Sequence, residues 1–528
     1  METYNEEITD EEEESFPSEE QELCSEESSY KGYLHFIPAR YVFTWMGFCG
    51  FFYLHALRVT LNVAIVAMVN SSISDKNVTI IDECPFPKVD NSTGLIKEGE
   101  FDWDETLQGT ILGSFYYTYV LTQLLGGRMA EIYSSKWVYG VTIVGTSVLS
   151  ILTPLLARVH VAALIVVRVL EGLLGGPSYP AMHVMLGHWL TRSQRGLLSS
   201  MVFIGGDIGT VISILITGMM CETDFLGGWP AGFYLLGAGG IVWFIFWIFL
   251  AFDSPEDHPR ISKQELIFIQ KDQNRAHGNK KAPVPWKNVL TSIPIWMLIA
   301  THFGQDFGLN MLLTELPTYM KNILHFNMET NGLLSALPYL FRASVAWIAG
   351  SIADFMVRKR YLSISVTRKV CNTIGSMGPA LCLIGVVLAG CNNIVNVTLF
   401  TLAMTLNGFS FSGYMVNHLD LAPDFAGTLM GLTNGLSQIS GFIAPAIVGT
   451  LTEHKQTLHQ WSIVFFLTSA VYFVTGVLFA TFGSAELQPW GVAHHRKETT
   501  KSRKKGEDDP RRLEDNVPVF TLSRTIDS

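Results

Sequence analysis

The chain has 528 residues, of which 48% are apolar and 16% are charged, and its formal net charge is −11. We expect no nucleic-acid partner, and the seven cysteines lack the CxxC spacing of a metal or redox site. With no nucleophile–base set, metal-ligand spacing or phosphate loop visible, we expect neither an enzyme nor a cofactor. Many windows of about twenty residues carry at most one charge, which is typical of a polytopic membrane protein.

We predict an all-α membrane protein with twelve transmembrane helices in two six-helix halves. The helices are expected at residues 41–69, 106–127, 137–157, 161–189, 197–221, 231–252, 293–318, 331–356, 370–390, 394–416, 425–450 and 461–483. The expected division is an acidic cytoplasmic tail, an N-terminal half, a polar linker, a C-terminal half and a second tail, at residues 1–40, 41–252, 253–292, 293–483 and 484–528. Neither tail has the composition of a folded segment.

The basic residues predict the orientation of this chain in the membrane. With both termini in the cytoplasm, the inner segments hold 27 Lys and Arg residues, the outer loops hold 6, and 3 lie within spans. This distribution obeys the positive-inside rule. The glycosylation sequons at Asn70, Asn77 and Asn91 agree, because all three fall in the first outer loop. Cys84 and Cys221 are also expected on the outer side, where a disulfide between them is chemically permitted.

Arg58 is the costliest residue of the first span. An arginine near the bilayer centre costs roughly 2.5–3.5 kcal/mol on insertion scales, and Arg58 is still followed by a run of apolar residues before the loop at Asn70. Its planar guanidinium matches a carboxylate or a phosphate. We therefore predict an anion receptor facing a water-filled cavity; the alternatives are an arginine that snorkels to the surface or pairs with a buried carboxylate.

The segment after the second predicted span recurs 223 residues later, after the eighth. Glycine, alanine, carboxylate and lysine return at identical offsets, as Gly127, Ala130, Glu131 and Lys136 and again as Gly350, Ala353, Asp354 and Lys359. The glycines permit close helix approach, and the charged residues are expected to form a cytoplasmic latch that breaks when the halves rock. This repeat resembles the loop signature of the major facilitator superfamily. The resemblance implies alternating access about a site near the bilayer midplane.

The fourth predicted span carries Arg168, Glu171 and His183. Arg168 and Glu171 lie three residues apart, so they share a helix face and can neutralise each other. A buried carboxylate of this kind can carry a proton, although an inert structural pair is the alternative. His183 can titrate near neutrality or can be a hydrogen-bonded packing residue.

Several other polar residues fall within predicted spans. Asp207 and Asp306 each lie between glycines, and an intramembrane carboxylate is a candidate for proton coupling; hydrogen bonding to a neighbouring helix is the alternative, above all for Asp306. Tyr119, with its tyrosine neighbours in the second span, either lines the cavity or packs. Arg342 either faces the cavity or pairs with a carboxylate.

Several motifs together resemble one family of the major facilitator superfamily. They are Arg58 within His55-Ala-Leu-Arg-Val-Thr-Leu-Asn, Arg168-x-x-Glu171-Gly, Pro180-Ala-Met-His183, Leu316-Pro-Thr-Tyr-Met-Lys, Leu334-Ser-Ala-Leu-Pro-Tyr and Asn417-His-Leu-Asp-Leu-Ala-Pro. The family is that of the anion–cation symporters, which includes sialin, the vesicular glutamate transporters and the sodium–phosphate cotransporters. The resemblance runs from about Arg40 to Trp490. It implies that Arg58 binds the substrate anion, and that Arg168, Glu171 and His183 lie on the substrate and proton path.

Two departures from the family pattern limit what can be carried over. Gly175 stands where sialin has a second glutamate, so a two-carboxylate relay is not implied. Gln305 stands near an arginine of the glutamate transporters, which argues against a dicarboxylate clamp.

We expect a monomeric, proton-coupled transporter of small organic anions of the sialic acid or acidic amino acid type, in a lysosomal or vesicular membrane. Sodium-driven uptake of phosphate or organic anions at the plasma membrane is the alternative. A non-transporting anion sensor is a third reading.

Overall fold

The computed structural model describes residues 37–69, 84, 99–273, 283–324, 326, 328–452 and 457–492. The sequons at Asn70, Asn77 and Asn91 and most of both predicted tails lie outside the described residues.

The helices of the first half follow one another with short connections. They are α2 (Ala39–Met68), α3 (Glu105–Ile132), α4 (Ser135–Val159), α5 (Val161–Gly175), α6 (Ser178–Trp189), α7 (Arg195–Glu222) and α8 (Pro230–Leu250). Side-chain caps set several starts: the Asp104 carboxylate accepts from the Leu107 amide, and the Ser134 hydroxyl accepts from the Trp137 amide. The predicted fourth span is two helices, because α5 ends before Pro177, which has no backbone N–H to donate.

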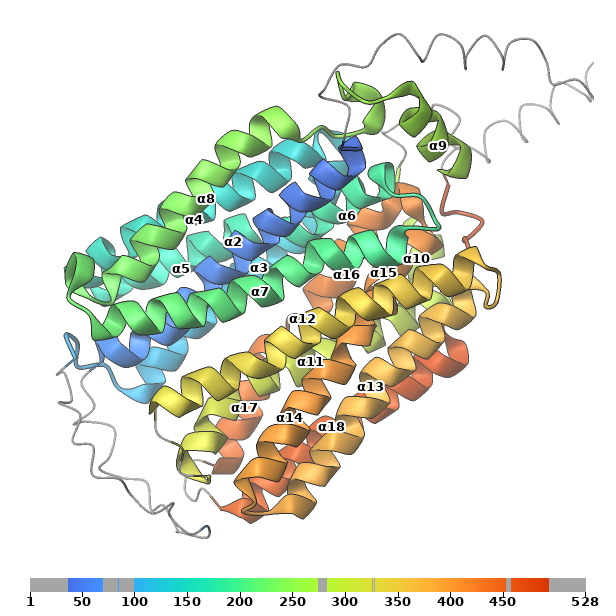
Figure 1. Cartoon of the computed structure of the whole chain (residues 1–528). Helices are drawn as coiled ribbons and strands as arrows, with labels where there is room; N and C mark the ends of the chain where they lie inside the picture. Colours follow the sequence, from blue (N-terminus) through green and yellow to red (C-terminus); the bar gives the residue numbers. More distant parts are fainter. Residues whose placement is uncertain are drawn as a thin grey trace, which may run out of the picture.

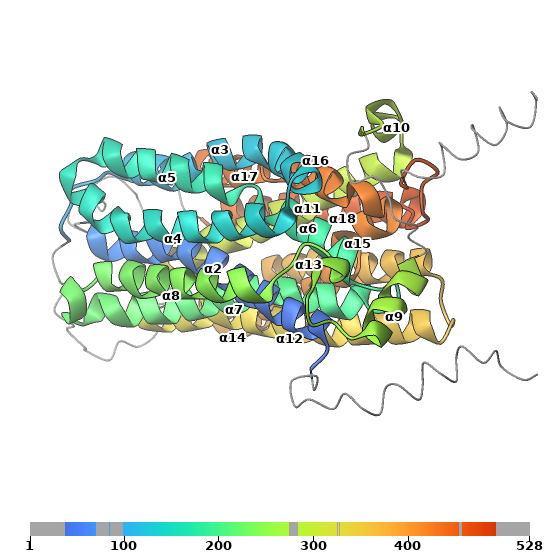
Figure 2. The same ribbon diagram turned by 90° about the horizontal axis from the view of Figure 1, so that it is seen from above.

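The linker and the second half follow the same plan. Two short helices, α9 (Lys263–Gln273) and α10 (Trp286–Leu290), precede the longer ones. The second half contains α11 (Ile293–Asn322), α12 (Met328–Arg358), α13 (Ile364–Ala389), α14 (Asn393–Asn407), α15 (Tyr414–Leu421), α16 (Ala426–Ser437), α17 (Ser440–Thr452) and α18 (Leu458–Phe482). A short 3-10 turn at Gly408–Ser412 separates α14 from α15. Both α9 and α10 lie at one end of the bundle (Figures 1 and 2).

The helices have the length and composition of membrane spans. Within the described residues, nine candidate spans are long and apolar enough to cross a bilayer. The other three predicted spans, 106–127, 293–318 and 425–450, coincide with α3, α11 and the pair α16–α17. Large apolar side chains such as Leu121, Leu388 and Ile394 are exposed to 70%, 81% and 81% on the outer faces of their helices. These are the surfaces that lipid covers in a membrane protein.

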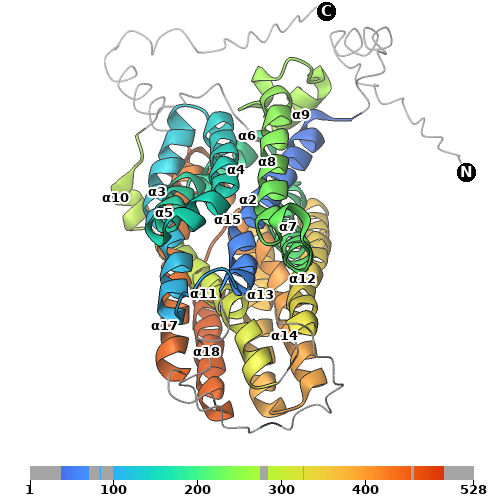
Figure 3. The same cartoon turned by 90° about the vertical axis from the view of Figure 1, so that its left-hand side faces the viewer.

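The helices fall into two groups that follow the order of the chain. In Figures 1 and 3, helices α2 to α8 lie on one side, and helices α11 to α18 on the other. The groups meet where α7 packs along α12 and where α3 packs along α16. Gly127 of α3 lies directly against the backbone carbonyl of Gly427, so a larger residue at this crossing would force the helices apart.

A disulfide joins Cys84 to Cys391, with the two Cα atoms 5.4 Å apart. The pairing of Cys84 with Cys221 that the sequence suggested is therefore wrong. Both Cys221 and Cys391 end spans on the predicted outer side, and the sequence gives no measure of which one lies within reach of Cys84. The observed bond connects the loop after α2 with the turn between α13 and α14, and so links the two halves.

Candidate substrate and coupling site

Arg58 lies on α2 and points at the aromatic face of α3. Its Nη2 donates to the Tyr116 hydroxyl at 2.6 Å. The guanidinium carbon lies 4.8 Å from the centre of the Tyr116 ring, 5.2 Å from that of Phe115 and 5.6 Å from that of Tyr119. Among the described residues, no carboxylate forms an ion pair with Arg58. Aromatic rings and one hydroxyl hold the guanidinium in place but leave its charge without a counter-ion.

A cavity opens beside this guanidinium. It is lined by Leu54, His55, Leu57, Arg58, Phe115, Tyr119, Thr146, Glu171 and Tyr179. Three residues selected from the sequence, Arg58, Tyr119 and Glu171, therefore meet at one site. His55 and Tyr179, which the sequence did not single out as site residues, add a hydrogen bond of 3.0 Å between the His55 Nε2 and the Tyr179 hydroxyl. The cavity thus combines a cation, a carboxylate and hydroxyl groups with apolar walls, which is the usual makeup of a small-molecule site.

Arg168 and Glu171 form a buried ion pair on α5. The Arg168 Nη1 donates to the Glu171 Oε2 at 2.7 Å, and both residues are buried. The Arg168 guanidinium also lies 5.1 Å from the centre of the Phe115 ring, the same ring that Arg58 contacts. The Phe115 ring therefore contacts both the guanidinium of Arg58 and the paired guanidinium of Arg168. A proton added to Glu171 would release Arg168 as a second free cation next to the cavity.

His183 of α6 lies at the contact between the two halves. Its Nδ1 is 2.9 Å from the carbonyl oxygen of Tyr179, and its Nε2 is 3.1 Å from the carbonyl oxygen of Met415, on α15. Carbonyl oxygens only accept, a neutral imidazole has one N–H, and an imidazolium has two. Both contacts are satisfied only when His183 is protonated. This histidine is not among the residues that line the Arg58 cavity.

Asp306 lies on α11 in a hydrogen-bonded cluster of the second half. Its Oδ2 accepts from the Ser437 hydroxyl at 2.5 Å and from the Gln438 amide at 2.8 Å, and it is 3.7 Å from the Nε2 of His302. Asp306 is therefore hydrogen-bonded to groups outside its own helix, which was the alternative to a role in proton coupling. Its role in coupling stays a prediction.

Two histidines that the sequence analysis missed extend this cluster toward His183. The Thr433 hydroxyl lies 3.1 Å from the Nδ1 of His302 and 2.7 Å from the Nε2 of His418. The His418 ring is 5.4 Å from the ring of His183. The four-residue spacing of His302 and Asp306, which puts them on one helix face, is the signal that could have found this cluster.

Asp207 of α7 pairs with Arg342 of the other half. The Arg342 Nη1 donates to the Asp207 Oδ1 at 2.8 Å, and both residues are buried. Of the two alternatives for Arg342, pairing with a carboxylate is the one found. Gln305 lies nearby, where it accepts from the amide of Asn407 at 2.6 Å and donates to the Ser376 hydroxyl at 2.8 Å.

The repeated loop segments join the halves at the end of the bundle that carries α9 and α10. Glu131 accepts from the backbone amide and the hydroxyl of Thr428, both at 2.6 Å, at the start of α16. Asp354 accepts from the backbone amides of Gly196 and Leu197, at 2.9 and 2.7 Å, at the start of α7. Each carboxylate thus caps a helix N-terminus of the opposite half, where free N–H groups and the helix dipole favour negative charge.

The two lysines of the repeat do not take part in these cross-half contacts. The Lys136 Nζ donates to the carbonyl of Ile248, in its own half, at 2.7 Å. Lys359 is exposed. Within the repeat, the carboxylates and the glycines, rather than the two lysines, make the contact between the halves.

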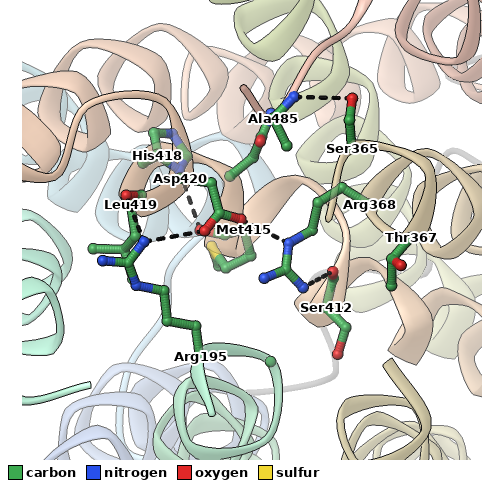
Figure 4. A network of polar contacts seen from close by, with 12 residues as sticks. Arg195, Ser365, Thr367, Arg368, Ser412, Met415, His418, Leu419, Asp420 and Ala485 are labelled. Atoms are coloured by element: carbon green, nitrogen blue, oxygen red, sulfur yellow. Dashed lines mark hydrogen bonds and ion pairs between the residues drawn. The ribbon is translucent and has the colours of Figure 1, made fainter. Parts of the chain in front are cut away.

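A second contact at this end was missed by the sequence analysis. Asp420 of α15 is held between two buried arginines, with Arg195 of α7 at 3.1 Å and Arg368 of α13 at 2.8 Å (Figure 4). Arg195 comes from the first half and the other two residues from the second. Three carboxylates, Glu131, Asp354 and Asp420, therefore join the halves on one side.

The Major Facilitator Superfamily family model matches residues 47–445. The chain is 38% identical to human "Sialin", covering 87% of this chain and 92% of sialin. It is also 38% identical to a "Putative inorganic phosphate cotransporter" of Drosophila ananassae, covering 84% and 92% of the two chains, and 36% identical to "Vesicular glutamate transporter 1" of Xenopus laevis, covering 86% and 76%. A solved structure of the proton:xylose symporter XylE superposes with a TM-score of 0.64 at 11% identity, covering 86% of this chain and 98% of that one.

The chain therefore belongs to the major facilitator superfamily of membrane transporters, and it is not an enzyme. Within the superfamily it belongs with the sialins, the vesicular glutamate transporters and the phosphate cotransporters, as the sequence motifs predicted. The likeness to XylE shows the shared fold alone.

Proposed function

We propose that the protein carries small organic anions, of the sialic acid or acidic amino acid type, across the membrane together with protons. The observation that carries the proposal is the guanidinium of Arg58, which has no carboxylate partner among the described residues and borders a cavity. A buried cation without a counter-ion is unfavourable, and an anionic substrate would neutralise it. The planar guanidinium would hold a carboxylate through two parallel hydrogen bonds.

Glu171 supports proton coupling at the same cavity. When Glu171 is ionised, its negative charge neutralises that of Arg168. When Glu171 is protonated, the positive charge of Arg168 would be free to attract the substrate anion. Proton binding and anion binding would therefore favour each other, because coupling between two binding sites is reciprocal. His183 would contribute a second proton-dependent contact, because its link to the carbonyl of Met415 joins the two halves.

Alternating access would use the contacts that join the halves. In this conformation Glu131, Asp354 and Asp420 close one end of the bundle, which the distribution of basic residues assigns to the cytoplasm. Opening that end requires each carboxylate to leave its partners. These hydrogen bonds and ion pairs would break and re-form during each cycle, together with the apolar packing of the two halves around them.

The membrane and the assembly state are proposed on more general grounds. The name of the Xenopus relative assigns that protein to vesicles, and we propose a lysosomal or vesicular membrane with both termini in the cytoplasm. One chain supplies both halves of the fold, and we propose a monomer.

A second candidate is sodium-driven uptake of inorganic phosphate or organic anions at the plasma membrane. The Drosophila relative named as a phosphate cotransporter favours it, at an identity equal to that of human sialin. The Arg58 guanidinium would bind a phosphate as well as a carboxylate. A sensor that binds an anion without moving it would use the same cavity.

Reconstitution of the purified full chain into liposomes separates these candidates. Uptake of labelled N-acetylneuraminic acid, L-glutamate, L-aspartate and inorganic phosphate would be measured under an inward proton gradient, an inward sodium gradient and no gradient. We expect uptake of the sialic acid or of an acidic amino acid to be accelerated by the proton gradient alone. Phosphate uptake that requires sodium would replace this proposal with the second candidate, and binding without uptake would indicate a sensor.

A further inference from the structure

The ion pair of Asp207 and Arg342 joins the two halves away from the contacts described at the end of the bundle. Asp207 lies on α7, eleven residues after Gly196, and Arg342 lies on α12, twelve residues before Asp354. At 1.5 Å per residue, the pair is roughly 17 Å along the helices from the contact of Asp354 with Gly196. This distance puts an ion pair between the halves about halfway through a bilayer whose apolar core is about 30 Å thick.

The two partners of this pair are held very differently. Arg342 has further partners in its own half, because its Nε donates to the Asn407 amide oxygen at 2.9 Å and its guanidinium lies 4.6 Å from the centre of the Phe411 ring. Asn407 is fixed in turn by Gln305. Asp207 has one hydrogen-bond partner, Arg342, and its Oδ2 is buried without any partner within the described residues. Loss of the pair would leave Arg342 in place but would leave Asp207 as an uncompensated buried charge.

Few other charged or titratable groups act on Asp207. Tyr179 of α6 and Tyr339 of α12 are within electrostatic range, and the ring of His55 from α2 lies against the neighbouring Gly206. Within the described residues, no cation other than Arg342 forms an ion pair with Asp207. If Arg342 binds another anion, the buried carboxylate of Asp207 loses its only ion-pair partner among the described residues, and protonation is the direct way to neutralise it.

We propose that Asp207 is a tethered, protonatable counter-ion, and that Arg342 is a second binding group for the anionic substrate. A proton from the entry side converts the Asp207 carboxylate to a neutral carboxylic acid, and Arg342 exchanges this side chain for an anionic group of the substrate. The charge at the pair is zero before the exchange, and it is zero again once one proton and one anionic group have entered. The inference rests on the proposed transport of anions with protons, and it assigns one coupled proton to this pair.

The first test needs no substrate. Thermal unfolding of the full chain would be compared at about pH 5 and about pH 7.5 for wild type, R342Q, D207N and the double variant D207N/R342Q. We expect R342Q to unfold about 5 °C or more below wild type at the higher pH and to recover at the lower pH, because protonation removes the stranded charge. The double variant should lack this pH-dependent loss. Arg158→Gln, which breaks an exposed ion pair with Glu100, is the matched control and should change little at either pH.

The second test measures binding of N-acetylneuraminic acid and of inorganic phosphate as a function of pH. One proton taken up per anion gives up to about a ten-fold change in affinity per pH unit. D207N should bind the transported anion with a dependence on pH that is reduced by about one proton, and R342Q should bind it at least ten-fold more weakly than wild type.

The outcomes separate this inference from the proposed function. If R342Q does not recover at low pH, or if D207N keeps the full pH dependence of wild type while proton-driven uptake persists, the inference is overturned and the proposed function stands. If neither probe binds wild type, sialic acid and phosphate are both excluded as substrates, and the thermal comparison still decides whether Asp207 depends on Arg342. If R342Q cannot be purified but D207N/R342Q can, the unpaired charge of Asp207 is confirmed as the cause of the instability of R342Q.

Discussion

Replacing Arg58 with lysine should remove most transport although the positive charge is kept. The guanidinium donates to Tyr116 and lies within 6 Å of three ring centres on α3, an arrangement that fixes the direction of its remaining N–H groups. An ammonium group is compact and cannot donate in parallel to both oxygens of a carboxylate.

The size of this effect follows from the hydrogen bond to the substrate that lysine cannot make. A hydrogen bond to a charged group contributes about 1.5–3 kcal/mol. Each 1.36 kcal/mol corresponds to a factor of ten, so kcat/KM for anion uptake should fall roughly 10- to 150-fold.

Initial rates of uptake in proteoliposomes, corrected for the amount of protein inserted, provide the assay. Arg158→Lys is the control, because Arg158 is exposed and pairs with Glu100 far from the cavity. We expect this control to retain wild-type rates. Uptake by Arg58→Lys within two-fold of wild type would show that the guanidinium geometry is not used, and would remove Arg58 from the substrate site.

Three further predictions concern coupling and the contacts between the halves. Glu171→Gln should lower proton-driven accumulation but leave substrate exchange measurable, because glutamine keeps the size and cannot titrate; accumulation at the wild-type level would refute this role. Neutralising Glu131 or Asp354, each to its amide, should open the cytoplasmic end, since each loses a charge–dipole contact worth about 0.3–1 kcal/mol, or up to about 2 when partly buried; unchanged cysteine labelling from that side in both variants would contradict it. In wild type, cysteine labelling from the cytoplasmic side should rise with pH, because only the imidazolium of His183 donates to both carbonyls and deprotonation weakens its link between the halves. His183→Gln should remove this dependence on pH; a profile equal to that of wild type would show that His183 stays neutral.

The sequence predicted the helices well because membrane spans depend on local composition. Each predicted span overlaps a helix or a helix pair, and the break at Pro177 follows from the chemistry of proline. Two residues of the cavity could be recognised from local composition as well. Arg58 and Glu171 each stand out as a charge within an apolar run, and any such residue needs a partner or a polar cavity.

The partners of these residues could not be predicted, because they lie far away in the chain. Glu131 contacts Thr428, which is 297 residues away, and it binds a backbone amide that no side-chain pattern reveals. Asp207 and Arg342 were each recognised as charges within predicted spans, but nothing in the sequence indicated that they pair across the two halves. The disulfide was mispredicted for a related reason, since three outer cysteines permit several pairings and only the packing of the halves decides among them.

Proton movement driven by the substrate alone tests the central claim most directly. Liposomes containing the full chain and a trapped pH indicator would be given an inward gradient of N-acetylneuraminic acid or of an acidic amino acid, with equal pH and equal sodium on both sides. Coupled transport predicts that the lumen acidifies as the anion enters, and that Glu171→Gln lowers the number of protons that enter with each anion while exchange continues. Anion entry without acidification in wild type, or entry that needs a sodium gradient, would contradict the proton-coupled mechanism.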